Sequence, residues 1–297
     1  MPPSPARPPV RLLRSPYDSG HAGVRMGAGP TALAEAGAAD RLRRRGHVVI
    51  EQVVEPSAAW RTEVATAFEL SRLVAGAVTT ACASGEVPVL LSGNCNTTLG
   101  VLAGLAASGR RVGLLWLDAH GDFNTPEEDT GGFLDGQGLA IAVGRCWTAL
   151  AGGVPGFVPL AERDVVLVGA RDLTPAQQEV LRRSGVAWLP PDRVRDGAAF
   201  DVTLDGFADR VDVVHWHVDL DVYDPAIAPA NGYAAPGGLS AGDVLDLFER
   251  TAAQLPVASA TLASYDPSYD RRGRLRDTAL DLLEAVAARA TPVTRAP

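Results

Sequence analysis

The stretch Asp118-Ala-His120-Gly-Asp122 is the most informative part of this sequence. It directly follows the apolar run Val112–Leu117, which has the length and residue types of a buried β-strand. Because side chains alternate in direction along an extended chain, Asp118, His120 and Asp122 can face the same side. They would then lie at the carboxyl end of the strand, the edge at which open parallel sheets carry their sites.

A second stretch of the same kind, Asp219-Leu-Asp221, follows the run Val211–Val218. Several like charges are too costly to bury together unless a cation lies between them. Oxygen-rich ligands with a little imidazole suit Mn²⁺ or a similar ion. Acids that merely cap helices or lie in loops are the plain alternative, but two such clusters at strand ends favour a metal site.

The two stretches resemble the metal-binding motifs of the arginase and agmatinase family, the ureohydrolases. Residues 118–126 read D-A-H-G-D-F-N-T-P, and residues 218–225 read V-D-L-D-V-Y-D-P. The resemblance also covers residues 23–30, 92–100, 169–172 and 236–239. It therefore spans nearly the whole chain.

The resemblance implies a centre of two Mn²⁺ ions whose bridging hydroxide attacks the carbon of a guanidinium or related C–N group. Metal ions lower the pKa of bound water, so such a centre needs no nucleophilic serine or cysteine. Asp118 and Asp219 would bridge the two ions, His120 and Asp221 would bind one of them, and Asp122 would bind the other. Asp122 would also accept a hydrogen bond from the hydroxide, as a catalytic residue.

One ligand position departs from the family pattern. Most members carry a histidine there, whereas residues 92–96 read Ser-Gly-Asn-Cys-Asn, which puts Cys95 in its place. Thiolates prefer softer ions, so the options are a weakly held Mn²⁺, replacement by Zn²⁺ or Fe²⁺, or a site with one ion. The other interpretation is that Cys95 is a small buried residue after a strand, as free cysteines often are.

The positions that match the family's substrate-contacting residues have changed more than the metal ligands. The substrate-binding candidates are Asn124, Phe133, Thr174, Tyr233 and Ser264. Thr174 replaces the aspartate that holds the amino group of arginine, and Ser264 replaces the glutamate that pairs with its guanidinium. A guanidinium loses much of its binding energy without a bidentate carboxylate partner. We expect L-arginine to be a poor substrate and the true substrate to be less polar or less cationic.

Two residues are candidates for proton transfer. The family's proton-shuttle histidine corresponds to Asp135, which alternatively caps a helix beginning near Gly136. His217 shares a strand face with Asp219 and Asp221. It is a candidate extra ligand, a residue that orients a ligand, or a proton carrier, the alternative being a hydrogen-bonded histidine of the core.

Runs rich in β-branched residues alternate with amphipathic segments, which predicts a three-layer α/β/α sandwich with a mostly parallel eight-stranded sheet. The expected strands cover residues 10–14, 47–54, 87–91, 112–117, 165–169, 186–189, 213–218 and 258–264. The expected helices include residues 31–45, 63–83, 97–108, 175–184, 240–254 and 278–290. We expect residues 1–9 to be a disordered, proline-rich tail and residues 10–297 to form a single domain.

Composition narrows the choice of partners. The formal charge is −8 and no large basic cluster occurs, which argues against nucleic acid. No apolar run approaches the roughly 20 residues of a membrane span, and the N-terminus lacks the apolar region of a signal peptide. The 3 cysteines are too few for a disulfide framework. We expect a cytoplasmic homo-oligomer with a small-molecule substrate and neither a nucleic-acid nor a membrane partner.

Together these features predict a metal-dependent hydrolase of a linear amidine-type C–N bond, with guanidino compounds as the leading substrate class. The alternatives within the enzyme class are a formiminoglutamase-like enzyme and an N-hydroxyguanidine hydrolase. The alternative from another class is a catalytically silent homologue with a structural or regulatory role.

Overall fold

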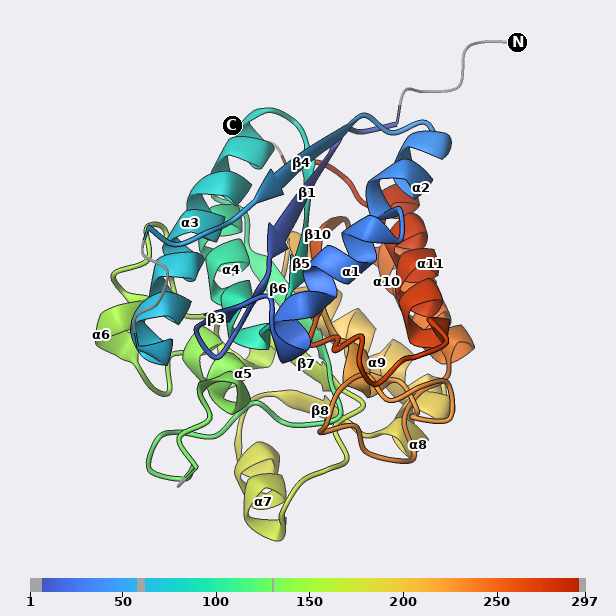
Figure 1. The fold of residues 1–297 in the computed structure, drawn as a ribbon. Coiled ribbons are helices and arrows are strands. Elements are labelled where there is room, and N and C mark those ends of the chain that lie inside the picture. The colour runs from blue at the N-terminus through green and yellow to red at the C-terminus, as the bar shows by residue number, and fades with distance from the viewer. Residues whose placement is uncertain (1–6, 58–61, 130, 294–297) are drawn as a thin grey trace.

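The computed structural model describes residues 7–57, 62–129 and 131–293, and an eight-stranded sheet runs through its middle (Figure 1). Every pair of neighbouring strands in this sheet is parallel. The strands are β1 (Val10–Ser15), β4 (Val49–Val53), β5 (Val87–Ser92), β6 (Val112–Leu117), β7 (Val165–Val168), β8 (Ala187–Leu189), β9 (Val213–Asp219) and β10 (Val257–Ala263). All eight expected strands are therefore present.

The order of the strands in space differs from their order in the chain and runs β4-β1-β5-β10-β9-β6-β7-β8. As a result β9 and β10, the last two strands of the chain, lie between β5 and β6. All carboxyl ends of parallel strands meet at one edge of the sheet, so the loops after these four central strands converge there. Ligands of open parallel sheets bind in crevices at such points.

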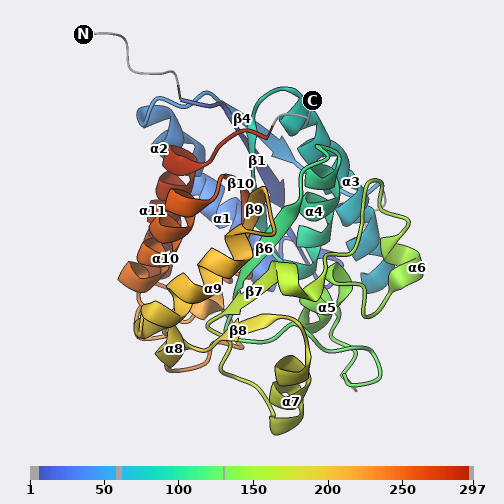
Figure 2. The same cartoon turned by 180° about the vertical axis from the view of Figure 1, so that it is seen from behind.

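Helices cover both faces of the sheet, which makes three layers (Figures 1 and 2). Two clusters of buried apolar residues pack between the sheet and its helices. One contains Leu42, Phe248 and Leu283, and the other, on the opposite face, contains Phe68 and Leu102. The helices are α1 (Gly29–Glu35), α2 (Ala38–Arg44), α3 (Glu63–Ala83), α4 (Thr98–Ala106), α5 (Gly138–Ala142), α6 (Thr148–Ala151), α7 (Pro175–Arg183), α8 (Pro191–Arg195), α9 (Ala198–Ala208), α10 (Ala241–Gln254) and α11 (Arg274–Arg289).

The helix expected over residues 31–45 is in fact two helices, α1 and α2. Gly37 lies between them with a φ of 90°, a backbone conformation that L side chains rarely adopt. The chain bends there, so a single helical periodicity does not continue. The prediction for residues 63–83 is confirmed, and the Thr62 hydroxyl accepts the backbone N–H of Ala65 to begin α3.

The proline-rich start of the chain is only partly within the described residues. Residues 1–6 lie outside them, whereas Pro8 and Pro9 both accept hydrogen bonds: the His47 ring is 3.0 Å from the Pro8 carbonyl, and the Val87 N–H is 2.8 Å from the Pro9 carbonyl. The described residues therefore make hydrogen bonds to the rest of the protein from Pro8 onward. Among the described residues, no helix has both the length and the apolar character to cross a membrane.

Candidate metal centre

The loop after β5 brings Cys95 to the carboxyl edge of the sheet. Gly93 permits the tight path, because a Cβ at this position would lie 2.2 Å from the Tyr17 carbonyl oxygen. The Asp135 carboxylate then accepts the backbone N–H groups of Cys95, at 3.1 Å, and Asn96, at 2.8 Å. It also accepts the Asn94 amide at 2.9 Å. Three donors on one carboxylate fix the backbone of this loop.

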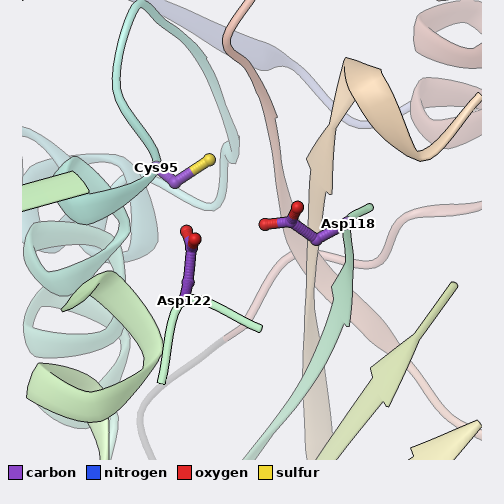
Figure 3. A group of neighbouring side chains, drawn as sticks. All are labelled: Cys95, Asp118 and Asp122. Carbon is purple, nitrogen blue, oxygen red and sulfur yellow. The ribbon is translucent and has the colours of Figure 1, made fainter. Parts of the chain in front are cut away.

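Cys95, Asp118 and Asp122 form a first group of potential metal ligands (Figure 3). One ligand atom of each residue lies within 4.8 Å of the others. Asp118 follows β6 directly, and the chain turns back at Asp122, whose φ is 46°. A positive φ is uncommon for an aspartate and indicates a backbone constrained by its surroundings.

Asp118, His120 and Asp221 form a second group, which shares Asp118 with the first. The His120 Nδ1 atom lies 3.3 Å from the Asp118 Oδ1 atom and 3.3 Å from the Asp221 Oδ2 atom. Asp221 sits in a 3₁₀ turn just after β9, and its other oxygen accepts the Ala119 N–H at 3.1 Å. The loops after β6 and β9 therefore hold each other in place.

Asp219, the last residue of β9, reaches toward both groups. Its Oδ2 atom is 3.0 Å from the Cys95 sulfur, and its Oδ1 atom accepts the Asp221 N–H at 2.8 Å. The structure thus brings together all six residues that the sequence suggests as metal ligands. Asp118 belongs to both groups, and Asp219 contacts one member of each, Cys95 and Asp221.

The electrostatics of the cluster call for a positive charge. Burial, followed by neighbouring carboxylates, raises the pKa values of Asp118, Asp122 and Asp219. Burial alone would lower the pKa of His120, but Asp221 and Asp118 outweigh it and raise the value to about 12. Sulfur, imidazole and carboxylate donors within reach of one another fit divalent transition ions.

A cavity of about 190 Å³ opens onto four of the six potential ligands, His120, Asp122, Asp219 and Asp221. Asn124, Phe133, Tyr233 and Ser264, four of the expected substrate contacts, line it together with Asp135. The rings of Phe133 and Tyr233 stack with their centroids 5.4 Å apart. Both residues also line an outer cavity of about 670 Å³. The aromatic pair therefore stands where the inner and outer cavities meet.

Thr174, the fifth expected substrate contact, lies elsewhere. It lines a neighbouring cavity, and its hydroxyl accepts the Gln177 N–H at 3.3 Å to begin α7. The Gln177 side chain accepts the Thr174 N–H at 2.7 Å and donates to the Asn124 Oδ1 atom at 3.0 Å. Gln177, which the sequence analysis missed, thereby orients the Asn124 amide so that its NH₂ group is left for other partners.

The two candidates for proton transfer are placed very differently. Asp135 faces the cavity, but its oxygens are engaged by the loop of Cys95, so it caps the start of that turn and not a helix near Gly136. Burial raises the pKa of Asp135 to about 7, against the effect of these donors. His217 is completely buried beneath Trp116, and burial holds its pKa well below the usual range. Its Nδ1 atom lies 2.7 Å from the Thr98 hydroxyl, but its Nε2 atom has no hydrogen-bond partner among the described residues, so only one ring nitrogen fits the hydrogen-bonded core histidine.

Trp116 is a further residue of the centre that the sequence analysis missed. Its indole N–H donates to the Asp118 Oδ2 atom at 2.9 Å. The position of Trp116 two residues before Asp118, on the same strand face, was the available signal. Its apolar surroundings in the sequence made it look like an ordinary core residue.

Comparison with known proteins was consistent with this geometry. The family model described as "Arginase family" matches residues 9–288. The chain is 29% identical to the arginase of Bacillus caldovelox over 93% of this chain and 96% of that protein. It is 30% identical to an N(omega)-hydroxy-L-arginine amidinohydrolase of Streptomyces lavendulae, over 72% of this chain and 74% of that protein. The solved structure of the Bacillus caldovelox arginase superposes with a TM-score of 0.85 at 28% identity, covering 94% of this chain and 98% of that one.

Proposed function

The chain belongs to the arginase family of hydrolases, which act on C–N bonds in linear amidines, and we propose a substrate for it within this class. The proposed substrate is a guanidino compound other than L-arginine. The observation that carries the proposal is the convergence of Asp122, Asp219, Asp221 and His120 on one cavity, with Asp118 buried beside them as a member of both groups of potential ligands. A set of buried carboxylates this dense is a strong candidate for metal-assisted hydrolysis. A catalytically silent subunit would have no need to retain it.

Two Mn²⁺ ions are the cofactors we propose, with another divalent ion as the alternative because of Cys95. Asp118 and Asp219 would be shared between the two positions, with Cys95 and Asp122 on one side and His120 and Asp221 on the other. Such ions, when bound, lower the pKa of water and polarise the carbon under attack.

The protein's own groups would then bind and orient the substrate. Asp122 is half-buried and faces the cavity, so its carboxylate is placed to accept a hydrogen bond from the attacking water. Asn124, oriented by Gln177, offers an NH₂ donor to an acceptor on the substrate. Asp135 holds the Cys95 loop and, because it also faces the cavity, is the remaining candidate to donate a proton to the leaving amine.

The lining of the cavity supports a substrate other than L-arginine. Ser264 has no carboxylate that could pair with a guanidinium, and its hydroxyl lies 3.2 Å from the Cys95 sulfur. The Thr174 hydroxyl is engaged at the start of α7, and the Phe133–Tyr233 pair adds aromatic surface. A less cationic group, or one with an apolar substituent, suits these walls better.

An N-hydroxyguanidine is the second candidate substrate. A hydroxyl on the guanidine nitrogen lowers its basicity, which suits a pocket without the pairing carboxylate. The Streptomyces lavendulae relative, named for N(omega)-hydroxy-L-arginine, favours this candidate. A formimino compound is the third, being an amidine of lower basicity than a guanidine.

The test is a substrate panel with the Mn²⁺-loaded full chain. Guanidino, N-hydroxyguanidino and formimino compounds are offered while urea, hydroxyurea, ammonia and formamide are each measured. We expect turnover of at least one amidine other than L-arginine. The matched control is Asp122→Asn, purified in parallel, which should lose activity and thus exclude a contaminating hydrolase. No turnover of any amidine by fully loaded protein would instead favour the silent homologue.

A further inference from the structure

The two groups of potential ligands that share Asp118 differ in chemistry. The first adds a sulfur atom from Cys95 to the carboxylates of Asp118 and Asp122. The second adds an imidazole nitrogen from His120 to the carboxylates of Asp118 and Asp221. In Figure 3 the Cys95 sulfur points into the space between the loops, toward Asp118. A sulfur in one position only makes the two positions unequal for any pair of ions.

The Cys95 sulfur is held at the centre by polar contacts. It lies 3.0 Å from the Asp219 Oδ2 atom and 3.2 Å from the Ser264 hydroxyl, and the residue is 1% exposed. The two backbone N–H groups bound by Asp135 prevent the loop from turning. A cysteine that only filled space would need neither the carboxylate nor the hydroxyl that its sulfur contacts. Its surroundings are those of a preformed ligand.

Ser264 occupies its position under constraint. Its φ is 63°, and its N–H donates to the Ser92 carbonyl at 3.2 Å. The Asn231 side-chain amide donates to the Ser264 carbonyl at 2.9 Å. The loop is therefore pinned on both sides of the Ser264 side chain. Such a constrained backbone at a site indicates that the direction of the side chain matters. The hydroxyl is directed at the Cys95 sulfur, to which it can donate a hydrogen bond.

Sulfur ligands select Zn²⁺, Fe²⁺ and Co²⁺ over Mn²⁺, whereas carboxylate with imidazole accommodates Mn²⁺. We infer that the centre takes two different ions: a thiophilic ion bound by Cys95, Asp118 and Asp122, and Mn²⁺ bound by Asp118, His120 and Asp221. Ser264 is a positioning residue that donates its hydroxyl hydrogen to the thiolate. The inference rests on the proposed two-ion function and deepens it by naming the ion at each position.

Co²⁺ is the probe, because a cobalt–thiolate bond gives a charge-transfer absorption in the near ultraviolet that oxygen and nitrogen ligands do not give. Metal-free full chain is titrated with Co²⁺, then supplied with excess Mn²⁺ and desalted for elemental analysis. We expect the absorption to saturate at the first equivalent of Co²⁺ and to survive the Mn²⁺. The final composition should be one cobalt and one manganese per chain.

Variants assign the signal to its residue. Cys95→Ser should abolish the absorption, whereas the matched control Cys146→Ser, at another buried free cysteine, should keep it. Ser264→Ala should shift the band and weaken binding of the first Co²⁺ roughly 10–100-fold, as loss of a residue that orients a ligand does. Circular dichroism checks that each variant is folded, and the wild-type titration stands even if Cys95→Ser fails to fold.

Several outcomes would overturn the inference. The absence of the band in wild-type protein would remove Cys95 from the ligands. A band that grows only with the second equivalent would show that Co²⁺ prefers the position without the sulfur. Displacement of all cobalt by Mn²⁺ would show that the two positions do not differ. An unchanged band in Ser264→Ala would remove Ser264 from its role. Amidine hydrolysis without a band contradicts this inference alone, whereas a band without hydrolysis of any amidine contradicts the proposed function alone.

Discussion

The indole N–H of Trp116 donates to the Asp118 Oδ2 atom at 2.9 Å, which ties the most central carboxylate of the site to the core of the sheet. The Trp116 ring is itself held, because the His217 ring stacks on it with the centroids 3.7 Å apart. The Thr98 hydroxyl lies 2.7 Å from the His217 Nδ1 atom and fixes that ring in turn. A chain of contacts thus runs from α4 through β9 to β6 and ends on Asp118, a proposed metal ligand.

We predict that Trp116→Phe weakens metal binding. Phenylalanine keeps most of the aromatic surface that packs on His217 but cannot donate to Asp118, so the carboxylate loses the contact that orients it. Loss of such a partner typically costs roughly 10–100-fold in metal affinity. Isothermal titration with Mn²⁺ measures the change. Trp188→Phe, at an indole that donates to the Ala170 carbonyl away from the ligands, is the control and should bind as wild type does. Equal affinity in both variants would contradict the role given to Trp116.

Asp135→Asn should disturb the Cys95 loop. The carboxylate accepts two backbone N–H groups and one amide, whereas an asparagine can offer one oxygen and must turn its own NH₂ toward a donor. A buried donor left without its partner costs roughly 1–3 kcal/mol. We therefore expect lower stability and lower metal content, measured by chemical denaturation and elemental analysis. A variant with full stability and full metal content but slow turnover would instead identify Asp135 as the proton donor.

The sheet was predictable because its central strands are apolar runs bounded by turn residues. Parallel strands buried on both faces, such as β5 and β6, read as continuous hydrophobic segments, so their existence does not depend on distant partners. Asp118 and Asp219 could likewise be recognised directly, because they stand at the ends of the apolar runs that form β6 and β9. Local sequence alone therefore specified the acidic part of the centre.

The contacts made by Asp135 and Gln177 join segments that are distant in the sequence, so they were not predictable. Asp135 binds a loop 40 residues away at Cys95, and Gln177 reaches Asn124 across 53 residues. No periodicity encodes such pairings. The place of His217 behind Trp116 was also hidden, because period two sets the face of a strand but not what covers it.

The buried His215 predicts how stability depends on pH. Burial lowers the pKa of His215 to about 3, from an ordinary value near 6.5. Between these values the unfolded chain binds a proton that the folded chain does not, so this residue makes stability fall as the pH falls from about 6.5 toward 3. We expect His215→Gln to show a shallower loss of stability over this range, measured by thermal unfolding at several pH values. A parallel loss in wild type and variant would show that His215 does not contribute.

L-Arginine should be a poor substrate, and Ser264→Glu alone should not repair this. A new carboxylate would lie beside the Cys95 sulfur, since the Ser264 hydroxyl is only 3.2 Å from it, and the two would repel each other once that sulfur binds a metal ion as the thiolate. In a Cys95→His background the same change should improve the binding of L-arginine, because a charge-assisted hydrogen bond contributes roughly 1.5–3 kcal/mol. KM values for urea release from L-arginine, across the two single variants and the double variant, test this coupling. Efficient hydrolysis of L-arginine by the wild type, or equal effects of Ser264→Glu in both backgrounds, would contradict it.

Asp118→Asn should empty both metal positions, because Asp118 is the residue that the two ligand groups share. Asparagine keeps the shape and can still accept the Trp116 N–H, but it lacks the negative charge that two cations would share. Asp122→Asn should instead impair the Cys95 position, and Asp221→Asn the His120 position, each leaving about one ion per chain. Elemental analysis after metal loading and desalting gives the content, with Asp205→Asn, at an exposed residue of α9, as the control that keeps full occupancy. Near-normal metal content in Asp118→Asn would mean that binding at the two positions does not depend on a shared Asp118.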